Sequence, residues 1–248
     1  MMTRIIFRLA LLSACCGLWL VQTATAQDFQ KTYRLAPGAS INVRNVSGNI
    51  TITGYEGDAI TVTAFKSGSD REMVEVQDMS SENRLEVEAR YPSNCNCNAD
   101  IRFELRVPRG ASYNFDQITT ASGDIRANGI RGQMRLTTAS GDVEVKDVAG
   151  QVSARSASGD VDVEIRSLEG TGDMKFASAS GDVHVRLPAN LDADVKLSTI
   201  SGTVRTDFPI EVRQPQYGPG SNARGRLGSG TRSLQITSAS GDVSLMKL

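Results

Sequence analysis

A short tag, Ser-Gly-Asp followed by Val or Ile, recurs through the second half of this 248-residue chain. From Ser122 onward, successive tags start 18, 18, 22, 21 and 39 residues apart. A short recurring period indicates that the chain repeats one small structural unit. Full copies begin at Ser122, Ser140, Ser158, Ser180 and Ser240, and degenerate copies begin at Ser47 and Ser201.

Each tag lies between two short runs in which apolar and polar residues alternate. Met134-Arg135-Leu136 precedes one tag, and Val143-Glu144-Val145 follows it. Alternation with period two predicts strands that have one buried face and one wet face. Turn residues such as Asn128-Gly129 and Ala149-Gly150 separate successive units.

One such unit cannot bury its own apolar face, so neighbouring units must stack to form a core. The sequence therefore predicts an all-β fold: a β-solenoid or β-roll of stacked two-strand coils, each 18–22 residues long. An antiparallel β-sandwich of hairpins, with Ser-Gly at the turns, is the alternative.

Stacking of equal coils would place equivalent residues in columns about 4.8 Å apart. Glycine suits the bend because it adopts backbone angles closed to other residues, and the following Asp can cap local backbone N–H groups as in Asx-turns. A buried hydroxyl column is expected from Thr138, Ser156, Ser178, Thr199 and Ser238. The bend residues assigned this structural role are Gly123, Asp124, Gly141, Asp142, Gly159, Asp160, Gly181, Asp182, Gly241 and Asp242.

The first 26 residues have the pattern of a secretory signal peptide. Arg4 and Arg8 precede an apolar run, and Ala24-Thr25-Ala26 gives an A-x-A site that predicts cleavage between Ala26 and Gln27. The alternative is a lipid anchor at Cys15, but the apolar stretch before that cysteine is short for an h-region. We expect export to the periplasm, the cell surface or the extracellular space, with no membrane span after cleavage.

Residues 27–248 are expected to form a single domain. Residues 27–110 alternate less regularly, residues 111–248 carry the regular tags, and residues 206–232 interrupt them as a basic loop. Loss of Arg4 and Arg8 leaves a mildly acidic chain, which gives no electrostatic reason to expect a nucleic-acid partner. Cys95 and Cys97 could form a local disulfide in an oxidising compartment.

The chain offers little for catalysis or for a cofactor, and we expect neither catalytic residues nor a cofactor or metal. The only histidine, His184, is out of phase with the core positions Val183 and Val185, so we expect it on the wet face. Stacked Asp could form a calcium ladder, but the nine-residue Gly-Gly-x-Gly-x-Asp signature is missing. A polysaccharide-acting enzyme would need a groove formed by outward charges such as Glu144, Asp162, Glu164 and Arg186.

The serial Ser-Gly-Asp-Val modules, the strand that ends at Val107-Pro108 and the closing stretch Ala223–Val243 resemble the bacterial adhesin-like domain family DUF4097. The resemblance covers about Ile41 to Leu248, and it implies a β-solenoid-like fold in a cell-envelope setting. It transfers no catalytic residue. We therefore expect a non-catalytic binding or scaffold module whose partner is an envelope or surface protein or a glycan; the alternative is a solenoid that assembles end to end. The oligomeric state is left open.

Overall fold

The computed structural model describes residues 27–214 and 218–248. The predicted leader lies outside these residues, so cleavage after Ala26 and lipidation at Cys15 stay predictions. Within the described residues, no helix has the length and apolarity needed to cross a bilayer.

The described chain is built from strands, with one 3-10 turn. Its first part contains β1 (Phe29–Tyr33), β2 (Ser40–Arg44), β3 (Ile50–Tyr55), β4 (Ile60–Ser67), η1 (Arg71–Met73), β5 (Glu75–Asp78), β6 (Arg84–Arg90) and β7 (Asp100–Pro108). The repeats form β8 (Ser112–Ser122), β9 (Ile125–Asn128), β10 (Arg131–Ser140), β11 (Val143–Ser158), β12 (Val161–Ser167), β13 (Met174–Ser180), β14 (Val183–Leu187), β15 (Ala193–Ser201) and β16 (Val204–Thr206). The last strands are β17 (Val212–Arg213), β18 (Ser221–Leu227), β19 (Ser233–Ser240) and β20 (Val243–Lys247).

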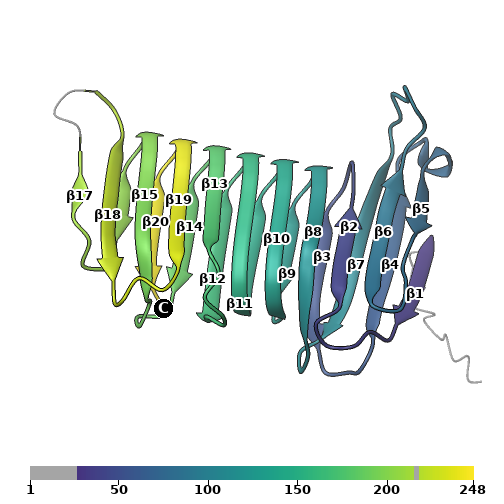
Figure 1. The fold of residues 1–248 in the computed structure, drawn as a ribbon. Helices are drawn as coiled ribbons and strands as arrows, with labels where there is room; N and C mark the ends of the chain where they lie inside the picture. The colour runs from purple at the N-terminus through teal and green to yellow at the C-terminus, as the bar shows by residue number, and fades with distance from the viewer. Residues whose placement is uncertain (1–26, 215–217) are drawn as a thin grey trace, which may run out of the picture.

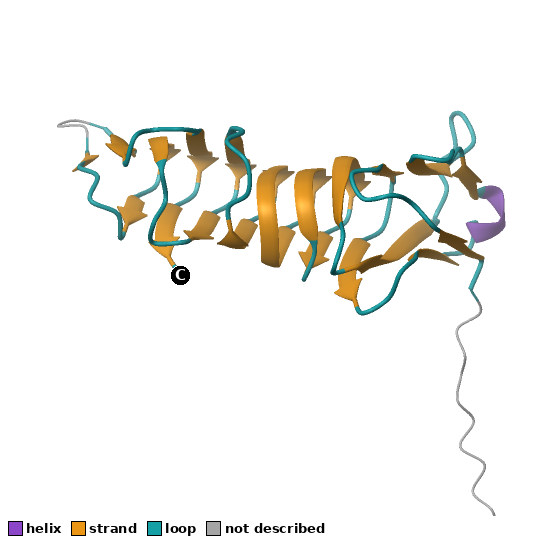
Figure 2. Ribbon diagram, turned by 60° about the horizontal axis from the view of Figure 1, so that its bottom comes forward, coloured by secondary structure: helices purple, strands orange, loops and turns teal. Residues whose placement is uncertain are grey.

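Each coil has one strand before the tag and one strand after it. The strands before the tag form one parallel row, row A, in the order β6, β2, β8, β10, the second half of β11, β13, β19 and β15. The strands after the tag form row B, in the order β7, β3, β9, the first half of β11, β12, β14, β20 and β16. The two rows enclose one apolar core along the length of the stack (Figures 1 and 2).

Alternation decides which side chains enter this core. Val143 and Val145 of β11 are fully buried, whereas Glu144 between them lies on the outer face. Leu136 of β10 stacks in register on Ala154 of β11, so equal repeat positions contact one another in neighbouring coils. The β-solenoid prediction is confirmed; the alternative of antiparallel hairpins is not observed because successive coils pair in parallel.

The order of the coils in space differs from their order in the sequence. β19 pairs in parallel with both β13 and β15, and β20 pairs with both β14 and β16. The last coil of the chain is therefore inserted between two coils that precede it, as Figure 1 shows for β19. The column order expected from the sequence is corrected accordingly: Ser238 lies between Ser178 and Thr199.

The first coil of the chain is inserted in the same way at the other end. β2 pairs with β6 and β8, and β3 pairs with β7 and β9. Residues 40–55 thus lie between two coils that follow them in the sequence. The first and the last coil of the chain are therefore both held by parallel strand pairing on two sides.

Antiparallel strands close the two ends of row A. β5 pairs antiparallel with β6 at one end, and β18 pairs antiparallel with β15 at the other. The basic loop expected over residues 206–232 therefore contains two strands, β17 and β18, which pair with each other. Phe208 and Ile210, which precede them, are buried and cover the end of the core.

One turn expected from the sequence is absent. β11 runs without a break from Val143 to Ser158, through Ala149 and Gly150. Gly150 has a φ of +133°, so the chain changes direction at this glycine while the strand pairing with β10 continues. The turn expected at Ala149-Gly150 is replaced by a bend inside a strand.

Candidate functional site

The tag glycines form a column at the edge where row A meets row B. Gly141 and Gly159 have φ values of +141° and +145°, which disfavour a side chain. A Cβ atom on Gly159 would lie 2.1 Å from the carbonyl oxygen of Gly141 in the next coil. Both the backbone conformation and the close approach therefore require glycine here.

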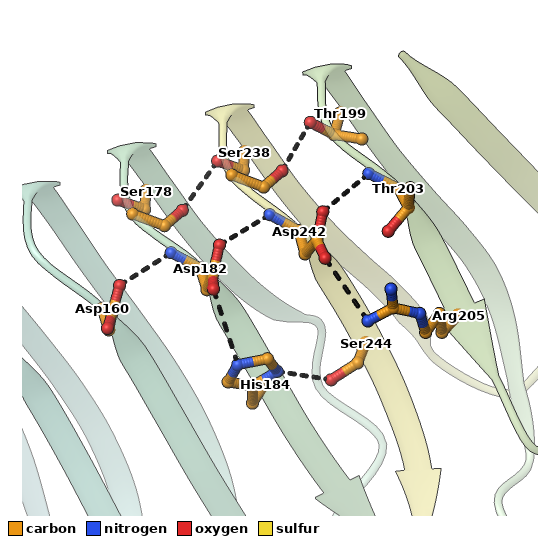
Figure 3. A network of polar contacts seen from close by, with 12 residues as sticks. Asp160, Ser178, Asp182, His184, Thr199, Thr203, Arg205, Ser238, Asp242 and Ser244 are labelled. Atoms are coloured by element: carbon orange, nitrogen blue, oxygen red, sulfur yellow. Dashed lines mark hydrogen bonds and ion pairs between the residues drawn. The ribbon is translucent and has the colours of Figure 1, made fainter.

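The tag aspartates form a ladder of hydrogen bonds between coils. The carboxylate of Asp142 accepts a hydrogen bond from the backbone N–H of Asp160 at 2.8 Å, and Asp160 accepts one from Asp182 at 2.8 Å. Asp182 in turn accepts a hydrogen bond from the backbone N–H of Asp242 at 2.7 Å (Figure 3). This corrects the expected local Asx-turn, because each Asp caps the next coil rather than its own.

The two degenerate tags mark the ends of this ladder. Asn49 accepts the backbone N–H of Asp124 at one end, at 2.8 Å. At the other end Asp242 accepts the N–H of Thr203 at 2.9 Å, and Thr203 has no carboxylate to continue the series. The hydrogen bond from Thr203 lowers the pKa of Asp242.

The hydroxyl column satisfies the carbonyl groups of the glycine column. Ser156 donates to Gly141 O and Ser178 to Gly159 O, both at 2.8 Å, and Thr199 donates to Gly241 O at 2.8 Å. Thr120 and Ser221, which were not expected in the column, extend it at both ends. These hydroxyl groups thus satisfy the carbonyl oxygens of the bend glycines inside the protein, as a structural element requires.

His184 lies on the outer face of row B, as expected. Its Nδ1 is 2.7 Å from Ser244 Oγ, and its Nε2 is 4.0 Å from Asp182 Oδ2 (Figure 3). Ser244 is buried, and the Asp182 contact is too long for a hydrogen bond that would orient an imidazole base. The three side chains do not form the geometry of a hydrolase triad.

Acidic side chains gather on the outer face of row B. Asp124, Asp142, Glu144, Asp160 and Asp162 line a hollow of about 220 Å³ together with Arg126. Lys146 donates to Glu144 and lowers its pKa, and Arg186 lies 3.4 Å from Asp162. Glu164 and Arg186 do not line this hollow, so the groove considered for a polysaccharide-acting enzyme is only partly assembled. Among the described residues no group of three or more His, Cys, Asp or Glu is placed to hold a metal ion.

The outer face of row A carries a strip of basic side chains, in contrast to the acidic side chains on row B. Four of its residues, Arg135, Lys175, Lys196 and Arg224, lie at one register position of β10, β13, β15 and β18. Arg155 of β11 lies two residues further along, on the same face. None of the five pairs with a described acidic residue at ion-pair distance. The strip spans six neighbouring strands, which is about 24 Å at the usual spacing.

A larger hollow, of about 630 Å³, adjoins this basic strip at β10. Its lining comes from Ser40 and Asn42 of β2, Asp116, Gln117 and Thr119 of β8, Arg135 and Thr137 of β10, and Arg84 of β6. Sequence reasoning did not identify these residues. The available signal was a break in alternation, since the buried residues Phe115 and Ile118 are three positions apart.

Cys95 and Cys97 lie in the connection between β6 and β7. The structure pairs their sulfur atoms, and their Cα atoms are 5.1 Å apart, within the usual disulfide range. Redox state in the cell depends on the compartment, so the disulfide stays a prediction that follows from export.

Parallel two-strand coils that share a core and a glycine bend column define a β-solenoid protein. The chain belongs to the DUF4097 family, described as Toastrack, whose profile matches residues 30–246. This confirms the resemblance found in the sequence.

Solved structures similar to this chain include a candidate cell adhesion protein from Clostridium sporogenes. It is 13% identical with a TM-score of 0.47, and the match covers 89% of this chain and 99% of that chain. A candidate adhesin from Bacteroides fragilis is 12% identical with a TM-score of 0.37, covering 88% of this chain and 96% of that chain. No curated protein matches the chain.

Proposed function

We propose that this protein is an exported, non-catalytic, adhesin-like module of the bacterial cell envelope that binds an anionic glycan along the outer face of row A. The observation that carries the proposal is the basic strip of Arg135, Arg155, Lys175, Lys196 and Arg224. The signal-peptide pattern of residues 1–26 supports export, and membership of DUF4097 supports an envelope setting.

The strip has the charge distribution that a linear polyanion needs. Cations on a protein surface are usually compensated by nearby carboxylates, but Asp194, which lies two residues before Lys196 on β15, already pairs with Arg226 at 2.7 Å. Uncompensated cations at strand spacing raise the local concentration of a polyanion and speed its association. The surrounding Gln and Thr side chains can hydrogen-bond to sugar hydroxyls.

A binding role fits the chemistry of the described residues better than catalysis does. The Ser-Gly-Asp columns bond one another, and the single histidine contacts a buried serine. The flat face of a solenoid is a common binding surface because its side chains are held at fixed spacing by the coils. We therefore assign a scaffold role to the Ser-Gly-Asp columns and a ligand-binding role to the basic strip.

The test uses the mature chain, residues 27–248, with polygalacturonate as a carboxylated polymer and dextran as a neutral one. We expect binding to polygalacturonate that weakens as salt is raised, because exposed charges are screened. Arg155→Gln/Lys175→Gln should reduce binding, whereas Lys146→Gln/Arg186→Gln, which removes the same charge from row B, should not. Equal loss in both double variants, or equal binding of dextran, would contradict the proposal.

A further inference from the structure

The hollow beside the basic strip exists because β8 carries a β-bulge. Met134 and Leu136 of β10 pair with Phe115 and Ile118, so β8 has one residue more than its neighbour over this stretch. β2, on the other side of β8, shows the same shift between Ser40 and Asn42. A bulge inside a central strand interrupts an otherwise regular stack and re-aims side chains, which is common beside binding sites.

The bulge turns two consecutive side chains toward the outer face. Asp116 and Gln117 are both exposed, although alternation would bury one of them. Asp116 is held in place by Ser40, whose hydroxyl donates to its carboxylate at 2.6 Å. One carboxylate oxygen is thus used within the protein, and the side chain is fixed at the rim of the hollow.

Asn42 gives a second, independent sign of a ligand. The residue lines the hollow and is only 6% exposed, and its Oδ1 atom has no hydrogen-bond partner among the described residues. Buried polar atoms in native structures are nearly always paired, and an exception requires an explanation. A donor supplied by a bound molecule would satisfy this oxygen.

The remaining lining combines donors and acceptors. Arg84 is engaged by the buried carboxylate of Glu86 at 2.9 Å, whereas Arg135 has no ion pair with a described residue. Thr119, Thr137 and Gln117 can both donate and accept. Hydroxyl groups of a sugar also donate and accept, so a polyhydroxylated ring matches this lining, and Arg135 can pair with a carboxylate on that ring.

We propose that the hollow beside the β8 bulge binds one carboxylated sugar unit. Arg135 pairs with its carboxylate, and Asp116 and Asn42 accept hydrogen bonds from its hydroxyl groups. This site deepens the proposed function, since Arg135 belongs to both the hollow and the basic strip. The hollow would hold one unit of the glycan, while the strip would hold the units that follow.

The experiment measures binding of trigalacturonic acid to the mature chain by calorimetry, with a neutral galactose trisaccharide for comparison. We expect Asp116→Ala to weaken binding of the acidic trimer by roughly tenfold, because a fixed charged acceptor is lost. Gln151→Ala, on the same face but outside the hollow, is the matched control and should bind normally. Asn42→Leu should also lose binding, but this buried change could unfold the protein.

Deletion of Gln117 keeps the test decisive, because it restores regular alternation between Phe115 and Ile118 and should leave the melting temperature unchanged or raised. We expect this variant to fold and to lose its binding of the acidic trimer. Normal binding by the folded deletion variant, or equal binding of the neutral trimer, would overturn the hollow site. If polygalacturonate binds through the strip but the trimer does not bind, the hollow site is wrong and the proposed function stands. If the trimer requires the hollow but the strip variants still bind the polymer normally, the proposed function is wrong and the hollow site stands.

Discussion

The carboxylate of Asp160 accepts a hydrogen bond from the backbone N–H of Asp182 at 2.8 Å, although the two residues are 22 positions apart in the chain. The bond joins two coils directly above one another. It shows that the tag has a structural role in each coil: the glycine permits the close approach of the next coil, and the aspartate links the two coils by a hydrogen bond. Substitution of a tag glycine and substitution of a tag aspartate should therefore lower the free energy of unfolding by different amounts.

We predict that Gly159→Val destabilises the fold more than Asp160→Ala. Valine at a φ of +145° is strained, which costs about 1–3 kcal/mol, and its Cβ would also meet the carbonyl of Gly141. Asp160→Ala removes one hydrogen bond at an exposed position, worth about 0.5–1.5 kcal/mol. Thermal or urea unfolding of the mature variants measures both changes.

The same melts test the calcium alternative. If the aspartates only link coils, wild type should melt at the same temperature with calcium and with a chelator. A ligand that binds only the folded state raises the melting temperature. A calcium-dependent rise that Asp160→Ala abolishes would show that the ladder holds the ion.

The insertion of β19 between β13 and β15 makes a prediction about distance. Ala177 and Thr237 are register partners on neighbouring strands, so Ala177→Cys/Thr237→Cys should oxidise to a disulfide in the mature chain. Ser198 is the partner of Thr237 on the far side of β19, so it lies two strand spacings, about 9.6 Å, from Ala177. Ala177→Cys/Ser198→Cys should therefore stay reduced, whereas a stack in sequence order would reverse the two results.

The sequence predicted the coils but not their order, and the reason lies in the tags themselves. Gly202 contacts Gly241, not Gly181, although Gly181 belongs to the preceding tag. Because every tag presents the same glycine, aspartate and hydroxyl, any two coils are compatible neighbours. Strand content and bend residues follow from the local pattern, whereas the order of the coils depends on pairings between strands far apart in the sequence, such as β19 with β13.

The hollow was also missed, for a different reason. The tags direct attention to the bend edge, where equal residues recur, while the hollow depends on a single irregular position in β8. Asn42 and Arg84 reach it from strands whose neighbours in space could not be inferred without the coil order. The columns were thus accessible to sequence reasoning, and the site that we propose was not.

We predict that the N-terminal end of the stack loses stability in acid, through Asp78. Burial alone would raise the pKa of this carboxyl, but hydrogen bonds from Lys31 and Ser80 outweigh burial and lower it to about 2. A carboxyl with a lowered pKa in the folded state contributes stability above its unfolded pKa of about 3.9. That contribution is lost as the pH falls through the window from about 4 to about 2, because protonation of Asp78 breaks the contact between β1 and the end of β5.

Melting temperatures of the mature chain between pH 6 and pH 2 measure this effect. Asp78→Asn should be less stable than wild type at pH 6, and the difference should shrink as the pH falls toward 2. Glu75→Gln, on the same strand and without an ion pair among the described residues, is the matched control and should follow wild type throughout. A constant difference between Asp78→Asn and wild type across this pH range would show that the Asp78 contact contributes through packing and not through its charge.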